Sequence, residues 1–226
     1  MTQTTPVESI AMKNLVVLIS GRGSNLQALL ATARAEDWEH KLELRVAAVI
    51  SNRADAPGLQ IAREFGVAVQ VLSHLDFSGR EAFDVALARA IDLHQPELVV
   101  LAGFMRVLTR TFVEHFAGRL LNVHPSLLPA FPGLATHRQA LAAGVRVHGA
   151  TVHFVSSDVD AGPIVAQGAL GVRADDDEES LGQRVLALEH QLLPRCVALV
   201  ARGDVWLERD QVRTRATAAT HLALFG

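Results

Sequence analysis

The sequence predicts an α/β fold: a single domain with a mostly parallel, twisted sheet flanked by helices. In the first half of the chain, short apolar runs rich in Val, Ile and Leu alternate with helical patterns, the order that gives parallel strands joined by right-handed crossovers. The runs are almost continuously apolar, which is typical of strands covered on both faces. With 226 residues, of which 50% are hydrophobic and 20% charged, the chain can bury a substantial core.

Each element of the first half follows from its local pattern. Five apolar runs predict strands at residues 15–20, 44–51, 67–72, 97–103 and 119–124. The helical patterns between these strands cover residues 25–34, 57–65, 80–93 and 110–116.

The second half departs from this alternation. A short helix is predicted over residues 137–143. Two strands at residues 147–156 and 163–172 are joined by the turn-rich segment SDVDAG, which favours an antiparallel pair. A helix follows at residues 180–199, after an acidic run that suits a helix N-terminus. Residues 203–212 (GDVWLERDQV) predict a small terminal hairpin.

Composition and charge argue against several classes of protein. The net charge of -3 and a pI near 6.4 provide no basic surface for nucleic acid. The single cysteine, Cys196, cannot form an internal disulfide. Residues 1–10 do not resemble a signal peptide, and no run is long and apolar enough to span a bilayer. We therefore expect a cytoplasmic protein with a flexible leader at residues 1–12, one domain at 13–226, and no nucleic-acid or membrane partner.

The segment SGRGSNLQALL (residues 20–30) follows the first predicted strand and opens a helix. Backbone N–H groups of residues 21–25 can point at one anion there, and this first turn of a parallel sheet often binds a ligand. The simpler alternative is a tight turn capped by Ser24 or Asn25. Leu26 stands where a dinucleotide fingerprint needs its last glycine, and no Lys-Ser/Thr follows as in a P-loop. A single phosphomonoester fits better than NAD or ATP.

The segment RLLNVHPSLLPAFPG (residues 119–133) brings two polar side chains to the end of a predicted strand, which its prolines then terminate. Asn122 and His124 are two residues apart and so project from the same face. At the carboxyl end of a strand they would face the crevice where α/β proteins bind ligands. For an arbitrary strand, a buried polar pair bonded to local backbone would be the preferred interpretation.

The loop SSDVDAG changes that preference because it supplies Asp158 and Asp160. An amide, an imidazole and a carboxylate are the groups that direct acyl transfer to an amine requires. The amide and imidazolium stabilise a tetrahedral oxyanion, and the carboxylate orients and charges the imidazole.

Histidines crowd the middle of the chain, at His115, His124, His137, His148 and His153. A metal site is not predicted, because His148 and His153 fall on opposite faces of a continuous strand and no H-x-x-x-H or cysteine pair accompanies them. We interpret most of these histidines as surface or packing residues. Ser126 lacks the elbow motif of a nucleophile, and Cys196 is interpreted as a core residue.

Six motifs, in order from Val16 to Pro194, match one family: VVLISGRGSNLQAL, GFMRVLT, LLNVHPSLLPAFPGLATHRQAL, HGATVHFV, DVDAGPIVAQ and LEHQLLP. With them the chain resembles the formyltransferase family, and within it the folate-dependent enzymes that formylate 5'-phosphoribosylglycinamide in purine synthesis. The resemblance implies the formyltransferase fold with a Rossmann-like N-terminal half. It also implies direct formyl transfer from the co-substrate 10-formyltetrahydrofolate, without a metal, by a monomer or homodimer that binds these small molecules.

The resemblance also implies roles for residues. Asn122, His124 and Asp160 would be catalytic, Glu189 would contact the ribonucleotide, and the turn that binds its phosphate would comprise Gly23, Ser24 and Asn25. The folate-binding positions would be Arg80, Met105, Arg106, Val107, Leu108, Asn122, Ser156, Ser157, Asp158, Val159 and Asp160. The phosphate-binding half would cover residues from about 13 to about 115. The catalytic and folate-binding half would cover residues from about 116 to about 205.

Two positions depart from the family pattern: Ala135, where relatives often carry histidine, and Leu186, which is often polar. Two other activities in the family are open, formyltetrahydrofolate hydrolysis and methionyl-tRNA formylation. We disfavour them because the first usually has an N-terminal regulatory domain, and the second a C-terminal barrel and a basic surface. A non-catalytic nucleotide- or folate-binding module is the alternative from another class. It would need the phosphate turn, but not Asn122, His124 and Asp160 together.

Overall fold

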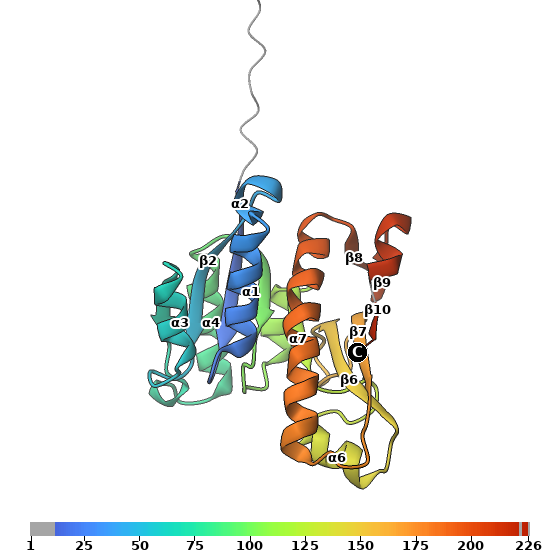
Figure 1. Cartoon of the computed structure of the whole chain (residues 1–226). Helices are drawn as coiled ribbons and strands as arrows, with labels where there is room; N and C mark the ends of the chain where they lie inside the picture. The colour runs from blue at the N-terminus through green and yellow to red at the C-terminus, as the bar shows by residue number, and fades with distance from the viewer. Residues whose placement is uncertain (1–11, 222, 226) are drawn as a thin grey trace, which may run out of the picture.

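The computed structural model describes residues 12–221 and 223–225, and a sheet of eight strands in the order β10-β7-β6-β5-β4-β1-β2-β3 forms its centre (Figure 1). The strands are β1 (Lys13–Ile19), β2 (Leu44–Ser51), β3 (Ala68–Val71), β4 (Pro96–Leu101), β5 (Leu120–His124), β6 (Val147–Phe154), β7 (Ile164–Gly171) and β10 (Ala223–Phe225). β1 to β5 are parallel, β6 is antiparallel to both of its neighbours, and β10 is parallel to β7. The predicted mostly parallel sheet is confirmed.

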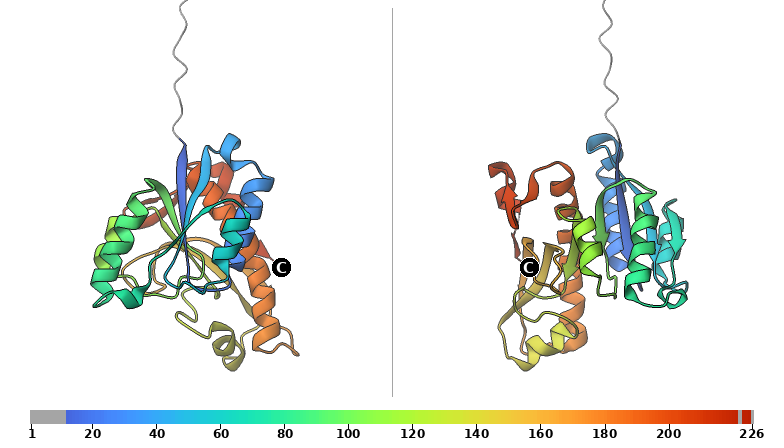
Figure 2. Two further views of the ribbon diagram at one scale, coloured as in Figure 1. Left: turned by 90° about the vertical axis from the view of Figure 1, so that its left-hand side faces the viewer. Right: turned by 180° about the vertical axis from the view of Figure 1, so that it is seen from behind.

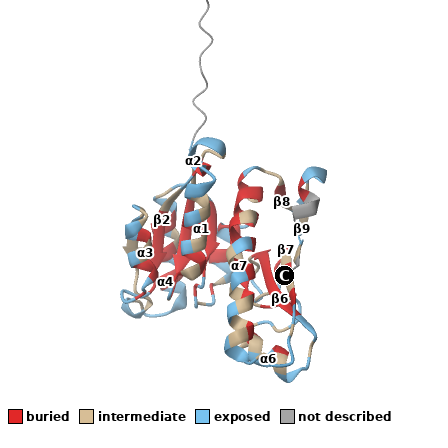
Figure 3. Cartoon of the chain, viewed as in Figure 1, coloured by how far each residue is buried: buried red, intermediate tan, exposed pale blue. Residues whose placement is uncertain are grey.

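Helices cover both faces of β1, β2 and β4, which is why these strands are almost continuously apolar (Figures 1 and 2). α1 (Ser24–Ala35), α3 (Gly58–Glu64) and α7 (Glu178–Ala201) pack into one core, and α4 (Arg80–Asp92) and α5 (Arg110–His115) pack into the other. The buried strands between these two layers are evident in Figure 3. Successive residues of β1, such as Val17 and Leu18, belong to opposite cores.

α7 is the longest helix of the described residues, and its N-terminus is set by a capping box. The Asp177 carboxylate accepts from the Ser180 backbone N–H at 2.8 Å, while the Ser180 hydroxyl oxygen accepts from the Asp177 N–H at 2.9 Å. The helix packs on α1, β6 and β7. Cys196 is fully buried on this helix, and burial raises the pKa of its thiol to about 12. Its interpretation as a core residue is confirmed.

The second half contains the predicted elements and some shorter ones. α6 (Thr136–Ala142) and the antiparallel pair β6–β7 are present as expected, and β8 (Val205–Glu208) and β9 (Gln211–Thr214) form the predicted hairpin. The sequence patterns missed α2 (Trp38–Lys41), η1 (His74–Asp76), η2 (Ala216–His221) and β10. Each of these spans six residues or fewer, so none shows a full hydrophobic period.

Apart from Met12, the predicted leader lies outside the described residues. Within the residues that the structure describes, no helix combines the length and apolar character needed to cross a membrane.

Candidate active site

β5 brings Asn122 and His124 to the middle of the sheet, between parallel β4 and antiparallel β6. The direction of the strands therefore changes at β5, and such a point is where open α/β sheets tend to bind ligands. His124 is only 4% exposed, and Asn122 is half-buried beside it. The two side chains share a face of the sheet, as their spacing predicts.

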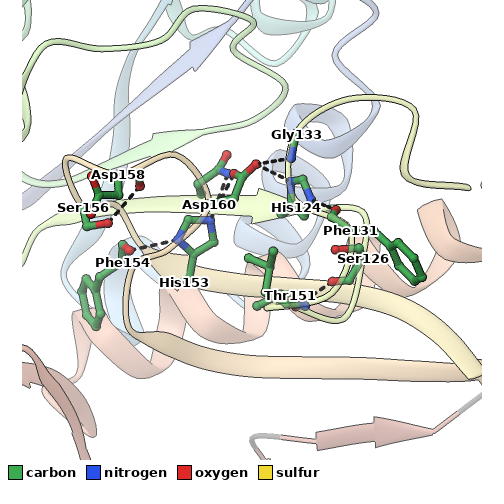
Figure 4. Close-up of polar contacts among 12 residues, drawn as sticks. His124, Ser126, Phe131, Gly133, Thr151, His153, Phe154, Ser156, Asp158 and Asp160 are labelled. Carbon is green, nitrogen blue, oxygen red and sulfur yellow. Dashed lines mark hydrogen bonds and ion pairs between the residues drawn. The ribbon is translucent and has the colours of Figure 1, made fainter. Parts of the chain in front are cut away.

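Asp160 reaches the same place from the loop between β6 and β7 (Figure 4). Its Oδ2 lies 3.3 Å from His124 Nδ1 and accepts from the Gly133 backbone N–H at 2.8 Å. The loop folds back tightly at Gly162, where a Cβ would lie 1.8 Å from the Phe154 carbonyl oxygen. Asp160 itself has a φ of 52°, a left-handed conformation that Asp and Asn adopt more readily than most residues.

The second nitrogen of His124 is also engaged. Nε2 lies 3.0 Å from the carbonyl oxygen of Phe131, which can only accept, so Nε2 carries a proton. With Nδ1 facing the Asp160 carboxylate, the imidazolium form satisfies both contacts. A ligand oxygen that approaches Nε2 would share or replace the Phe131 carbonyl.

The proline loop after β5 is held in place by buried hydroxyl groups (Figure 4). The Thr151 hydroxyl donates to the Ser126 carbonyl oxygen at 2.7 Å and accepts from the Leu128 N–H at 3.0 Å. The Ser126 hydroxyl donates to the Ala130 carbonyl at 2.6 Å. Ser126 is fully buried, so it supports this loop and has no access to a substrate as a nucleophile.

His153 is a site residue that the sequence did not single out. It lies directly opposite Asn122 in the β5–β6 ladder, and its Nε2 is 3.2 Å from Asn122 Nδ2. The same nitrogen is 3.9 Å from Asp160 Oδ1. Most of the histidines are interpreted as surface or packing residues, but strand pairing places the buried His153 among the three predicted catalytic residues. Pairing of the predicted strand at 147–156 with the predicted strand at 119–124 would place His153 at the site, but the sequence patterns do not give this pairing.

A cleft of about 740 Å³ opens beside this cluster. It is lined by most of the residues predicted to bind folate: Met105, Arg106, Val107, Leu108, Asn122, Ser156, Ser157, Asp158, Val159 and Asp160. His124, His137 and His153 also line it, as does Ala135, so the departure from the family pattern lies in the cleft wall. These residues come from the loops after β4, β5 and β6, from β5 and β6 themselves, and from the start of α6.

Arg80 is the one predicted folate residue outside this lining. It is exposed at the first position of α4, one turn before Asp84. The buried Asp84 carboxylate accepts from the Thr109 backbone N–H and so anchors the end of the segment that contains Arg106. Burial raises the pKa of Asp84, while the nearby charges of Arg80 and Arg106 act in the opposite direction. Both cations thus lie near Asp84, but only Arg106 lines the cleft.

The predicted phosphate turn lies between β1 and α1. Gly23 is the N-cap of α1, with φ 79° and no side chain capping the helix, so neither Ser24 nor Asn25 is the cap. The first N–H groups of an uncapped helix lack intrahelical partners and attract anions. Gly23 also packs against Gly58: a Cβ on Gly23 would lie 2.5 Å from the Gly58 Cα. A side chain here would therefore meet α3 before it could meet a phosphate.

Asn25 and Glu189 form a buried pair beside this turn. Asn25 Nδ2 donates to Glu189 Oε2 at 2.6 Å, and it links α1 to α7. Burial raises the pKa of Glu189 to about 7, although the hydrogen bond from Asn25 acts in the opposite direction. Leu186 is half-buried one turn earlier on α7. The structure thus brings Glu189 to Gly23, Ser24 and Asn25, as the resemblance implies.

The raised pKa of Glu189 predicts a loss of stability with increasing pH. The folded protein binds this proton more tightly than the unfolded chain does, so the wild-type free energy of unfolding falls as pH rises from about 4.5 to about 7. Glu189→Gln has no such titration. Its stability relative to wild type should rise by on the order of 2–3 kcal/mol between about pH 5 and about pH 8. Urea unfolding of both proteins at the two pH values measures this, and a difference independent of pH would contradict it.

Comparison with known proteins identifies the class that this fold and site define. Residues 13–197 match the Formyl transferase family, and the chain belongs to that family. It is 46% identical to phosphoribosylglycinamide formyltransferase of Escherichia coli (strain K12), over 91% of this chain and 99% of that protein. It is 44% identical to the trifunctional purine biosynthetic protein adenosine-3 of Homo sapiens, over 85% of this chain and 19% of that protein.

The fold of this chain also matches solved structures of similar enzymes. The crystal structure of glycinamide ribonucleotide transformylase 1 from Symbiobacterium toebii superposes with a TM-score of 0.85 and 46% identity, over 90% of this chain and 94% of that chain. The eight-stranded sheet is thus an arrangement shared with glycinamide ribonucleotide transformylases. Among residues 12–221 and 223–225, no group of three or more His, Cys, Asp or Glu side chains is placed to hold a metal ion.

Proposed function

We propose that the chain transfers the formyl group of 10-formyltetrahydrofolate to the amine of 5'-phosphoribosylglycinamide. The products are N-formylglycinamide ribonucleotide and tetrahydrofolate, in de novo purine synthesis. The observation that supports this most is the convergence of Asn122, His124 and Asp160 on one cleft. Membership of the family and the names of its relatives support the same activity.

In the proposed mechanism the substrate amine attacks the formyl carbon, and Asn122 and His124 stabilise the oxyanion that forms. The Asn122 amide and an imidazolium N–H of His124 are the donors. Asp160 Oδ2 faces the imidazolium and fixes the ring through its second bond to the Gly133 N–H. The Phe131 carbonyl accepts from Nε2, so the ring is held at both of its nitrogens.

Collapse of the tetrahedral intermediate must move one proton. The new C–N bond leaves the attacking nitrogen with an excess proton, and the folate nitrogen needs a proton as its bond to carbon breaks. Asp160 Oδ1 points away from the contacts that Oδ2 makes, and it is 3.9 Å from His153 Nε2. We assign to Asp160 the transfer of this proton through water. No covalent enzyme intermediate and no metal takes part.

The two substrates would occupy neighbouring subsites. Gly23, Ser24 and Asn25 would hold the ribonucleotide phosphate at the uncapped end of α1, and Glu189 would contact the same substrate. The cleft beside Asn122 has a volume suited to a small-molecule ligand. Its lining at residues 105–108 and 156–160, together with Arg80, would hold the folate.

Arg80→Ala should raise KM for 10-formyltetrahydrofolate by about tenfold and leave KM for the ribonucleotide within about twofold, because an exposed cation contributes on the order of 1 kcal/mol to a carboxylate ligand. Arg89→Ala is the matched control, since Arg89 is an exposed cation at the other end of α4. Initial rates with each substrate varied in turn measure both constants. If KM for the ribonucleotide changes instead, Arg80 does not belong to the folate subsite.

The decisive test of the function is an assay of formyl transfer to 5'-phosphoribosylglycinamide, with water-dependent hydrolysis of the folate and methionyl-tRNA formylation as competing readouts. Transfer to the ribonucleotide supports the proposal. Predominant hydrolysis, or a preference for methionyl-tRNA, would assign another activity of the family. Binding of both ligands without any turnover would indicate a non-catalytic module.

We further propose that residues 13–226 form one formyltransferase domain, with the phosphate-binding half at about 13–115 and the catalytic and folate-binding half at about 116–205. The protein would act in the cytoplasm as a monomer or homodimer on small-molecule substrates. Nucleic acid and membranes have no part in the proposed activity.

A further inference from the structure

His153 lies in a position to control the orientation of the Asn122 amide. The β5–β6 ladder pairs the two residues directly, and the imidazole is only 2% exposed. Figure 4 shows the ring beside Asp160. Both ring nitrogens have a defined neighbour: Nδ1 lies 2.9 Å from the Phe154 carbonyl oxygen, and Nε2 lies 3.2 Å from the Asn122 amide nitrogen.

These contacts determine the tautomer of His153. A carbonyl oxygen can only accept a hydrogen bond, so Nδ1 must carry the ring proton. Burial lowers the pKa of His153, and the neighbouring His124 lowers it further, although the hydrogen bond to the Phe154 carbonyl and the charge of Asp160 act in the opposite direction. The ring is therefore neutral at pH 7. A neutral ring protonated at Nδ1 has a free lone pair at Nε2, and that nitrogen is an acceptor.

An acceptor at Nε2 requires a donor on the Asn122 side chain, which is its NH₂ group and not its carbonyl oxygen. We propose that His153 is a positioning residue that holds the Asn122 amide with its nitrogen toward the reaction centre. One N–H of this group is used by His153, and the other is left to donate to the formyl oxygen. The inference rests on the proposed function, because it explains how Asn122 can be an oxyanion donor.

The opposite protonation state shows why this matters. A His153 imidazolium would donate from Nε2, and the Asn122 amide would turn its carbonyl oxygen toward the ring. The ring would also be drawn to Asp160 Oδ1, now 3.9 Å away, in competition with His124. The carbonyl oxygen of Asn122 repels an oxyanion, so a flipped amide would leave His124 as the remaining donor of the pair.

The test compares two substitutions at His153 in two backgrounds. His153→Gln keeps an acceptor near the position of Nε2, whereas His153→Leu keeps much of the volume and removes the acceptor. We expect His153→Leu to lower kcat by about thirtyfold or more, with both KM values within about threefold, as for a misaligned oxyanion donor. His153→Gln should recover most of kcat. In an Asn122→Ala background, His153→Leu should lower kcat by less than about threefold, because its effect passes through Asn122.

A second measurement requires no activity. In protein labelled with ¹⁵N at histidine, the NMR signals of His153 should show a protonated Nδ1 and an unprotonated Nε2 at pH 7, with or without ligands. A ring protonated at Nε2 would overturn the proposal, as would equal losses for His153→Leu and His153→Gln in correctly folded proteins, or the same loss in the Asn122→Ala background. If wild type shows the expected tautomer but transfers no formyl group to the ribonucleotide, the proposed function fails and the hydrogen bond stands.

Discussion

Asp160→Asn is expected to lower kcat by about a hundredfold or more, the scale on which loss of an oxyanion donor acts, or on the order of 3 kcal/mol. An asparagine oxygen can still accept from the Gly133 N–H and from His124 Nδ1, so the geometry of the loop is preserved. Asparagine also tolerates the left-handed backbone at this position, where φ is 52°. What is lost is the negative charge that lies 3.3 Å from His124 Nδ1. Binding constants for both substrates should change much less than kcat.

Asp158→Asn is the matched comparison, because it removes the same charge from the same loop at an exposed position. Its effect is expected on KM for the folate and not mainly on kcat. Rapid-quench measurement of a single turnover, with calorimetry for each ligand, separates binding from chemistry. If Asp160 acts only by holding the loop through Gly133, asparagine should substitute well. A folded Asp160→Asn enzyme with near-normal turnover would show that its charge has no catalytic role.

Gly23→Val is expected to weaken ribonucleotide binding by about a hundredfold or more and to destabilise the protein by about 2–3 kcal/mol. A β-branched residue is strained at φ 79°, and the new Cβ would lie 2.5 Å from the Gly58 Cα. The turn must therefore shift, and the N–H groups at the start of α1 move with it. Folate binding should change little, because the cleft beside Asn122 is lined by other segments.

Gly21→Ala is the matched control for the stability effect. A Cβ at Gly21 meets no atom within 4 Å, and its backbone is not left-handed, so the melting temperature should stay near that of wild type. Calorimetry with inorganic phosphate, the ribonucleotide and the folate would then compare the Val variant with wild type. Equal losses for ribonucleotide and folate would show that the turn is not a phosphate subsite, and so would full retention of ribonucleotide binding.

The sequence predicts most of the sheet because a strand that is buried on both faces consists almost entirely of apolar residues. β1, β2 and β4 are nearly unbroken apolar runs, and the structure buries them between two helical layers. β10 pairs with β7 through only three residues, and so short a strand depends on its neighbour more than on its own side chains. The same holds for α2, a single turn after Asp37.

The residues of the candidate site likewise divide into those that the sequence pattern predicts and those that depend on tertiary structure. Asn122 and His124 are visible because they interrupt an apolar strand at a spacing of two, and Asp160 because it lies in a polar turn. His153 and the Phe131 carbonyl could not be inferred from spacing. The contact between His153 and Asn122 depends on which strands pair and in what register. The contact between His124 and the Phe131 carbonyl depends on where a backbone atom lies in a loop whose path three prolines set. Both are properties of tertiary structure.

The packing of α7 has a consequence for synthesis on the ribosome. α7 covers α1 as well as β6 and β7, so a helix made of residues 178–201 completes a core that includes Leu26 and Leu29. At translation rates of about 5–20 residues per second, α1 emerges on the order of ten seconds before its cover. During that interval α1 can pack against α2 and α3, but the part of its apolar face that α7 covers has no partner of its own chain. The nascent protein should therefore depend on chaperones that hold exposed apolar segments until the last quarter of the chain has been made.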